Sequence, residues 1–216
     1  MKTLKVPLLD LDRLSDNSAL LALEEKGGRF IVGERNWGEA YPYFPLCAGE
    51  IARSETSLFI HFHVRGLDLR IRSLRDNERQ WEDSCCEFFC QDPDGGNYYN
   101  FELNAGGLLL SAIGPGRKDR PRRGPEQMAL IRRYTSLSPE LLGCERNGEV
   151  FSWDVMMAIP LQLIGIDGSN PPSSLRANFY KCADLSAHPH FLSWNPIDTP
   201  KPDFHTPEFF GELIFE

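Results

Sequence analysis

The sequence has no long hydrophobic run and no excess of positive charge, and each absence excludes a class of protein. No stretch approaches the ~20 consecutive apolar residues that a membrane span requires. Lysine and arginine number 23 against 31 aspartates and glutamates, so the formal net charge is −8. A nucleic-acid-binding protein needs a basic surface that displaces counterions from phosphates, and an anionic membrane repels a chain of this charge. We therefore expect neither partner, and a neutral ligand suits the charge better.

Other common signals are also missing. The N-terminal stretch MKTLKVPLLDLDRLSDN lacks the apolar core of a signal peptide, because Asp10 and Asp12 fall where that core would lie. This predicts a cytoplasmic protein, with an export signal removed during cloning as the alternative. The 6 cysteines form no CxxC pair and are expected to be buried thiols in a reducing compartment, with one redox pair as the alternative. The phosphate-binding, dinucleotide-binding and GxSxG motifs are absent as well.

Alternation of apolar and polar residues with a period of two predicts that strands dominate the chain. Residues 57–66 (SLFIHFHVRG) and residues 151–159 alternate in this way. Further strands are expected at 29–33, 68–73, 85–91, 97–104, 107–112, 128–134, 175–182 and 210–215. Turn signals such as Gly106-Gly107 separate these segments, and no alternation of strands with helices appears. The fold class predicted is an all-β antiparallel sandwich or jelly roll.

One short helix is expected before the first of these strands, over residues 15–26, with Ser15 or Asp16 as its N-cap. Residues 1–27 then form an N-terminal extension of a single domain that spans 1–216. The polar segment 114–127 is rich in Arg, Gly and Pro and is expected to be a solvated loop.

Three of the predicted strands carry polar faces that are rich in planar groups. Asparagine, glutamate, arginine and tyrosine suit paired hydrogen bonds to the hydroxyls of a sugar. The residues that these faces present are Glu87, Asn100, Glu102, Asn104, Arg176, Asn178 and Tyr180. The alternative is a plain solvated face, or a polar network that loops bury.

A tryptophan in a polar loop is a candidate platform for a ligand. Trp81 lies in DNERQWEDS, where a structural indole would have little support. Sugar rings pack their C–H groups flat on aromatic rings, whereas their hydroxyls need a polar rim. Trp153 alternates with polar residues on a strand and is expected in the core, as is Trp194.

Several segments together resemble the family 9 carbohydrate-binding modules, especially their stand-alone branch. These segments are WEDSCCEFFCQDPDGGNYYNFELNAGG, FSWDVMMAIP and the closing RANFYKCADLSAHPHFLSWNPIDTPKPDFHTPEFFGELIF, and the resemblance runs from about residue 28 to the C-terminus. It implies a β-sandwich with a DOMON-like topology. It also implies a non-catalytic site in which two aromatic rings clamp a sugar ring at the reducing end of a glycan.

Carried over by motif, the clamp residues fall on Trp81 and Phe204, and a carboxylate that accepts hydroxyl bonds falls on Glu87. Phe204 stands where xylanase-linked members have Trp, and Glu102 stands where they have Arg, so the sugar preference of this chain is expected to differ. His205 follows Phe204 and is a candidate helper for the ligand. The resemblance also implies a structural calcium ion, with Asp92 and Asp94 as candidate ligands; the alternative is a turn without metal.

Two other classes of function compete with this interpretation. Glu87 and Glu102, if they face each other, resemble the carboxylate pair of a glycosidase. His61 and His63 share a strand face at a spacing that can serve zinc, with a third ligand from His188, His190 or His205. The other class is a protein-interaction scaffold, in which an exposed tryptophan anchors a partner. The favoured prediction is binding of a neutral mono- or oligosaccharide, with no cofactor required and the oligomeric state left open.

Overall fold

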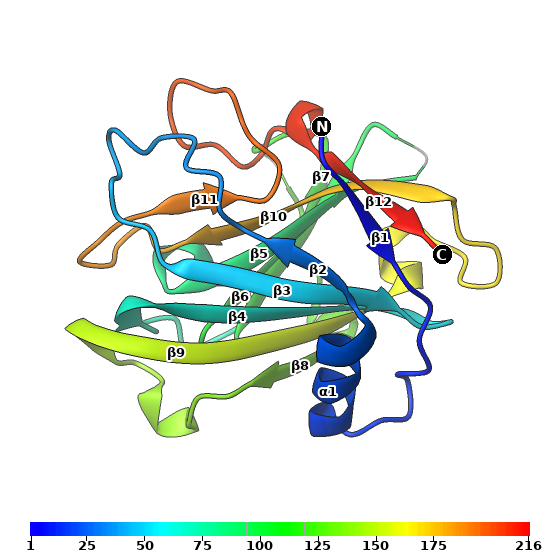
Figure 1. Ribbon diagram of the computed structural model, residues 1–216, viewed down its shortest axis with the longest axis horizontal. Coiled ribbons are helices and arrows are strands. Elements are labelled where there is room, and N and C mark those ends of the chain that lie inside the picture. The colour runs from blue at the N-terminus through cyan, green and yellow to red at the C-terminus, as the bar shows by residue number, and fades with distance from the viewer. Residues whose placement is uncertain (94, 119) are drawn as a thin grey trace.

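The computed structural model describes residues 1–93, 95–118 and 120–216. Two β-sheets pack face to face in it (Figure 1), as the alternation of the sequence predicts. The larger sheet has seven strands in the order β1 (Thr3–Val6), β12 (Gly211–Phe215), β10 (Ser174–Cys182), β5 (Cys85–Gln91), β6 (Tyr98–Asn104) and β7 (Leu109–Gly114), with β11 (Phe191–Ser193) paired to β10. The smaller sheet has the order β2 (Gly28–Ile31), β3 (Leu46–Arg53), β4 (Ser57–Arg70), β9 (Glu145–Pro160) and β8 (Arg132–Thr135).

Helices are few among the described residues. The α-helices are α1 (Asp16–Lys26) and α2 (Pro125–Ala129), and the 3-10 turns are η1 (Gln80–Glu82), η2 (Pro139–Leu141), η3 (Leu161–Ile164) and η4 (Pro207–Phe209). Ser15 caps α1 by accepting a hydrogen bond from the backbone N–H of Ser18, which confirms the first of the two expected caps. None of the described helices has the length and apolarity that crossing a membrane demands.

Residues of alternating strand positions from both sheets form the core between them. Leu58, Ile60 and Phe62 of β4 point inward and are fully buried, together with Phe88 of β5 and Phe179 of β10. Trp153 and Trp194 belong to the same core, as predicted. Burial of these large apolar side chains removes their surface from water and is the main term that stabilises the sandwich.

The outer face of the smaller sheet is also covered, because α1 lies across it. Leu23 of α1, Phe59 of β4 and Met156 of β9 are fully or almost fully buried in this second apolar layer. The alternation at residues 57–66 is typical of a strand with one solvent-exposed face, and the cover of α1 shows that this interpretation is wrong at this point of β4. The cover also explains why β3 escaped prediction: a strand with buried residues on both faces loses the alternation of apolar and polar positions.

Several boundaries differ from the sequence prediction. Residues 125–129 form α2, so the strand expected at 128–134 is confined to Arg132–Thr135. The segment expected as a separate strand at 68–73 is in part the end of β4, which runs to Arg70. The short strands β1 and β11 were not predicted, and β1 pairs in parallel with β12, which departs from a purely antiparallel sandwich.

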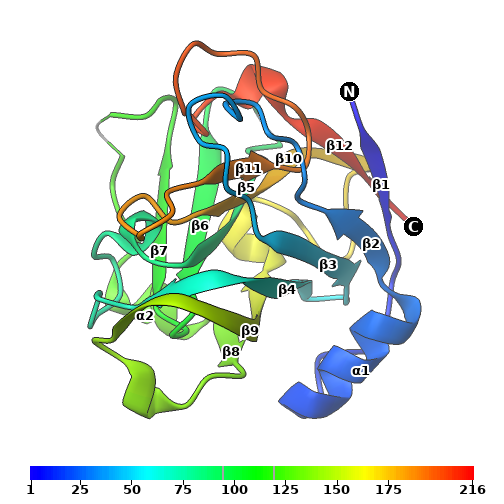
Figure 2. The same cartoon turned by 60° about the vertical axis from the view of Figure 1, so that its left-hand side comes forward.

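Loops gather over the outer face of the larger sheet. Figure 2 shows the loop between β2 and β3 and the loop between β11 and β12 arching over the same side of the molecule. Hydrogen bonds fasten the two loops: the Trp37 indole donates to the carbonyl of Thr199, and the amide of Ile197 donates to Asn36. These loops bury what would otherwise be a solvent-exposed strand face.

Candidate functional site

The register of the central strands brings their polar positions onto one face. Glu87 on β5 lies directly opposite Glu102 on β6 and opposite Tyr180 on β10. Asn100 on β6 is opposite Phe89, two pairs further along the same two strands and therefore on the same face. Since directly opposite residues in a sheet share a face, these side chains lie together on the outer side of the larger sheet.

Between this face and the covering loops lies a pocket of about 430 Å³. Such a volume falls within the range of small-molecule sites. Six of the predicted binding residues line it, namely Trp81, Glu87, Asn100, Glu102, Phe204 and His205. The other lining residues are Leu110, Ala112, Arg117, Arg120, Arg122, Cys182, Asp184, Phe191, Pro202 and Asp203.

The other four predicted rim residues do not line this pocket, because their side chains hold the fold together. Asn104 donates to Asp83 and accepts from the turn that follows β6. Arg176 donates to three backbone carbonyls around η4. Asn178 accepts from the amide of Asn195 and donates to its carbonyl, and the buried hydroxyl of Tyr180 donates to the carbonyl of Phe204.

The two predicted clamp residues differ in how they are held. Trp81 is half-buried in η1, and its carbonyl accepts from the amide of Asp184, which ties it to the end of β10. Phe204 is only 9% exposed. Its ring stacks on Tyr180 with centroids 4.2 Å apart and planes 8° apart. One face of Phe204 is therefore occupied within the protein, whereas the indole of Trp81 is the more accessible ring.

A third aromatic ring in the pocket, Phe191, was not predicted. It is half-buried on the short strand β11, and its centroid lies 6.3 Å from that of Phe204. A strand of three residues gives too short an alternation to be recognised in a sequence. Three aromatic side chains thus share one pocket with the carboxyl groups of Glu87 and Glu102, and with those of Asp184 and Asp203.

Both carboxyl groups of the pocket floor hold their protons more tightly than usual. Burial raises the pKa of Glu102 to about 7. Burial, followed by the nearby charge of Glu102, holds the pKa of Glu87 well above its ordinary value, although the Cys182 thiol donates to it at 3.0 Å. A protonated carboxyl can donate as well as accept a hydrogen bond, so the floor offers both functions.

The two carboxyl oxygens of Glu102 differ in their hydrogen bonding. The amide nitrogen of Asn100 donates to Oε1 at 2.9 Å. Oε2 is buried and has no hydrogen-bond partner among the described residues. A buried polar atom without a partner costs free energy, so a hydroxyl group that enters the pocket gains by bonding to it.

Arg120 extends this network and contradicts the prediction of a solvated loop over 114–127. Its guanidinium donates to Asn100 Oδ1 at 2.8 and 3.1 Å and stacks over the Tyr98 ring at 3.9 Å. Arg123 of the same loop is also buried and donates to the Ser111 hydroxyl. The high Gly and Pro content favours a loop, but composition does not show that the loop folds back over the sheet.

His205 and Asp184 complete the polar lining. Tyr98 and His205 share a hydrogen bond of 2.9 Å between the phenol oxygen and Nδ1. Burial lowers the pKa of His205 to about 3, so the imidazole is neutral near pH 7. Burial raises the pKa of Asp184 to about 7. The side chains of Glu87, Glu102, Asp184 and His205 are therefore uncharged at mildly acidic pH.

Comparison with known proteins agrees with this geometry. A family model described as carbohydrate-binding family 9 matches residues 17–215. The chain belongs to carbohydrate-binding family 9. A solved structure from Bacteroides uniformis ATCC 8492, provisionally described as a carbohydrate-binding protein, is 33% identical, has a TM-score of 0.86, and is matched over 100% of this chain and 99% of that one. No curated protein shows significant similarity to the chain.

Two more distant structures share the fold of this family 9 protein. They are family 9 modules from Caldicellulosiruptor kristjanssonii, one in complex with glucose and one with cellotriose. Their identities to this chain are 12% and 11%, and their TM-scores are 0.59 and 0.57. The matches cover 100% of this chain and 96% and 94% of theirs. The predicted family and the all-β fold class are thus confirmed.

The zinc hypothesis fails in its choice of a third ligand. His61 and His63 do share a face of β4, but this is the outer face of the smaller sheet. His205 lies in the pocket on the larger sheet. His188 bonds to Asp68, and His190 bonds to Lys181. The neighbours of the His61–His63 pair are carboxylates instead.

The calcium hypothesis remains a prediction for this family 9 protein. Asp92 follows β5, and its amide donates to the carbonyl of Asn97 across the β5–β6 turn. Asp94 lies outside the described residues. Asp92 belongs to neither of the two clusters of potential metal ligands found in the described part of the chain.

Proposed function

We propose that this family 9 protein binds a neutral mono- or oligosaccharide in the loop-covered pocket and leaves it chemically unchanged. The observation that carries the proposal is the unpartnered Oε2 of Glu102 on the floor of a pocket with aromatic walls. A sugar satisfies both features, since its hydroxyls bond to polar atoms while its C–H face packs on an aromatic ring.

The three aromatic rings of the pocket have different roles in sugar binding. Trp81, which is half-buried and therefore more accessible than Phe204, supplies the platform on which the sugar ring lies. Phe204 forms the opposing wall, supported from behind by Tyr180. Phe191 closes the remaining side. This arrangement keeps both predicted clamp residues and makes Phe204 the more rigid one.

The charges of the pocket favour a neutral ligand. Each arginine of the lining already has an internal partner: Arg117 pairs with Asp203 at 3.6 Å, Arg120 bonds to Asn100, and Arg122 donates to the carbonyl of Asn77. An anionic sugar would have to displace one of these partners to form an ion pair with an arginine of the lining. The ligands of the distant neighbours, glucose and cellotriose, are likewise uncharged.

The carboxyl pair is suited to binding rather than to hydrolysis. A glycosidase needs one protonated and one ionised carboxyl group at neutral pH. In this pocket, burial shifts the pKa of both groups upward, which weakens a general base or nucleophile. We therefore assign Glu87 and Glu102 to hydrogen bonding with sugar hydroxyls.

Calorimetric titration with glucose, cellotriose, xylo-oligosaccharides and glucuronic acid tests the proposal. Wild type should bind at least one neutral sugar and should bind glucuronic acid more weakly. Trp81→Ala should weaken that affinity by about tenfold or more, since a stacked ring contributes roughly 1–2 kcal/mol. Phe44→Ala is the matched control, because Phe44 is 47% exposed and lies outside the pocket.

Release of reducing sugar from a polysaccharide panel provides the second arm. Wild type and Glu87→Gln should both release none. Activity that Glu87→Gln abolishes would overturn the assignment of the pair to binding, and unaltered affinity of Trp81→Ala would overturn the assignment of the platform.

A further inference from the structure

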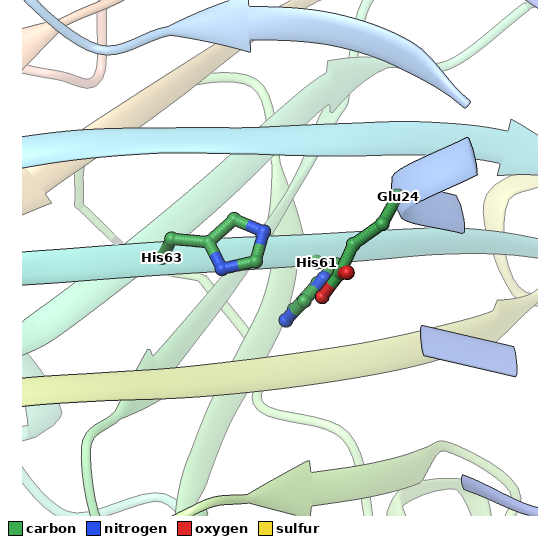
Figure 3. A group of neighbouring side chains, drawn as sticks. All are labelled: Glu24, His61 and His63. Atoms are coloured by element: carbon green, nitrogen blue, oxygen red, sulfur yellow. The ribbon is translucent and has the colours of Figure 1, made fainter. Parts of the chain in front are cut away.

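A second polar cluster lies on the outer face of the smaller sheet, away from the pocket. His61 and His63 stand side by side on β4, with ring centroids 4.0 Å apart. Glu24 reaches over His61 from the end of α1 (Figure 3). One carboxylate oxygen of Glu24 and one ring nitrogen of each histidine all lie within 4.8 Å of one another.

His61 is the residue that calls for explanation. It is 1% exposed, and neither of its ring nitrogens has a hydrogen-bond partner among the described residues. Oxygens of Glu50 and Asp154 lie 3.3 and 3.8 Å from these nitrogens, but neither contact has hydrogen-bond geometry. Both nitrogens of a buried imidazole normally have hydrogen-bond partners. The His61 ring lacks them, so the lone pair of its unprotonated nitrogen is available to bind a metal ion.

We propose that Glu24, His61 and His63 bind a divalent transition-metal ion, of which zinc is the representative. Two imidazoles and one carboxylate form a ligand set that such ions favour, whereas calcium and magnesium prefer oxygen ligands alone. The ligand atoms of a tetrahedral zinc site lie roughly 3.4 Å apart for bonds of about 2.1 Å. The exposed, flexible side chain of Glu24 can close the remaining gap.

Glu50 and Asp154 supply the support that metal-bound histidines require. Glu50 Oε2 lies 2.8 Å from Nε2 of His63, and Asp154 Oδ1 lies 2.6 Å from Nδ1 of the same ring. Both nitrogens of His63 are thus engaged by carboxylates, so metal binding displaces one carboxylate and releases the proton of that nitrogen, and the carboxylate at the other nitrogen fixes the orientation of the ring. Three carboxylates around two imidazoles also make the cluster attractive to a cation.

A glycine at the end of α1 allows the helix, and with it Glu24, to lie close to the sheet. Gly27 ends α1, and a Cβ atom at this position would approach the Cβ of Glu50 to 2.9 Å. The absence of a side chain lets the end of the helix approach β3 at the edge of the cluster. A bound metal ion would therefore hold α1 against the smaller sheet. The protection of α1 amides from hydrogen exchange should then show whether the metal site is occupied.

Titration of zinc into chelator-treated, dialysed protein tests the site. Wild type should bind one equivalent, with calcium unable to compete. Glu24→Gln should weaken binding by tenfold or more, as loss of one ligand does, and His63→Gln should weaken it further. Glu25→Gln is the matched control, because Glu25 is exposed on the same helix and, among the described residues, forms an ion pair only with Lys26, at 3.9 Å. The affinity of this variant for zinc should stay within twofold of wild type.

Two further measurements show which of the two clusters of potential ligands binds the ion. Zinc should slow amide hydrogen exchange in α1, and the cobalt complex should lack the near-ultraviolet band of thiolate ligation. A thiolate band would place the ion at the other cluster, Cys85, Glu87 and Cys182, and would overturn the proposal. So would failure of wild type to bind zinc, or equal affinity in Glu24→Gln and wild type; because Glu24 is exposed, its substitution leaves the fold intact.

Discussion

The two outer faces of this sandwich both bury carboxyl groups, but the carboxyl groups differ in protonation between the faces. On the larger sheet, loops bury Glu87 and Glu102, and burial raises the pKa of both. On the smaller sheet, α1 partly covers Glu50 beside two histidines, which lower its pKa to about 2 against the effect of burial. Buried carboxyl groups thus stay neutral where burial outweighs the nearby cations, and stay ionised where two imidazoles accompany them.

This difference suits the two faces to different ligands. A floor of neutral carboxyl groups bonds to hydroxyls, which carry no charge. A cluster of ionised carboxylates and imidazoles attracts a metal ion. The protonation of each cluster follows from its neighbours and not from burial alone, and substitutions on each face can separate the two effects.

The largest expected effect concerns Phe204, whose packing distinguishes it from Trp81. Phe204→Ala should lower the free energy of unfolding by about 3 kcal/mol, because it removes a buried ring that stacks on Tyr180. Urea denaturation measures this change. Phe44→Ala, at a 47% exposed ring, should cost less than about 1 kcal/mol; equal losses for the two variants would mean that Phe204 is not part of the packed wall.

Next in size is the pH dependence that Glu102 produces. Its pKa rises from 4.5 to about 7 on folding, so the folded state keeps a proton that the unfolded state has lost between these values. The free energy of unfolding should therefore fall as pH rises from about 4.5 to 7, by on the order of 2 kcal/mol. Glu102→Gln, a neutral isostere, should reduce the slope of the profile in this window, where Asp184, whose pKa burial also raises to about 7, still titrates.

The smallest effect concerns His63, which should change the stability at alkaline pH and not at acidic pH. Its hydrogen bonds to Asp154 and Glu50 raise its pKa to about 10, so its stabilising contribution is full below pH 6.5 and is lost as pH rises toward 10. Solvent screening of this part-exposed ring should keep the contribution below about 1 kcal/mol. In metal-free protein, His63→Gln should flatten only this alkaline range; a flattening at pH 4.5–7 would contradict the separation of the two faces.

The sequence was most informative within single strands. Alternation with a period of two correctly assigned Glu87, Asn100 and Glu102 to polar strand faces, and motif resemblance assigned Trp81 and Phe204 to the same site. Alternation shows which side chains share a face of one strand. It gives no information on what covers that face, and for this reason Asn178 and Tyr180 were expected at a sugar rim although they hold the covering loops.

The residues that escaped prediction come from segments without a regular period. Arg120 enters the pocket from a loop, and Glu24 reaches the histidines from a helix packed on the sheet that carries them. Their positions depend on tertiary packing, which local pattern does not encode. The histidine pair was recognisable from its spacing on β4, but its acidic neighbour is remote in sequence and becomes apparent only in the folded chain.

The most direct test of the account is a titration of the isotopically labelled protein with a neutral sugar, followed by nuclear magnetic resonance. We predict saturable shifts of the Trp81 indole N–H and the Asn100 side-chain amide, with the signals of His61 and α1 unmoved. Saturable shifts confined to the face of His61, or the absence of binding by every neutral sugar tested, would contradict the assignment of the loop-covered pocket to carbohydrate.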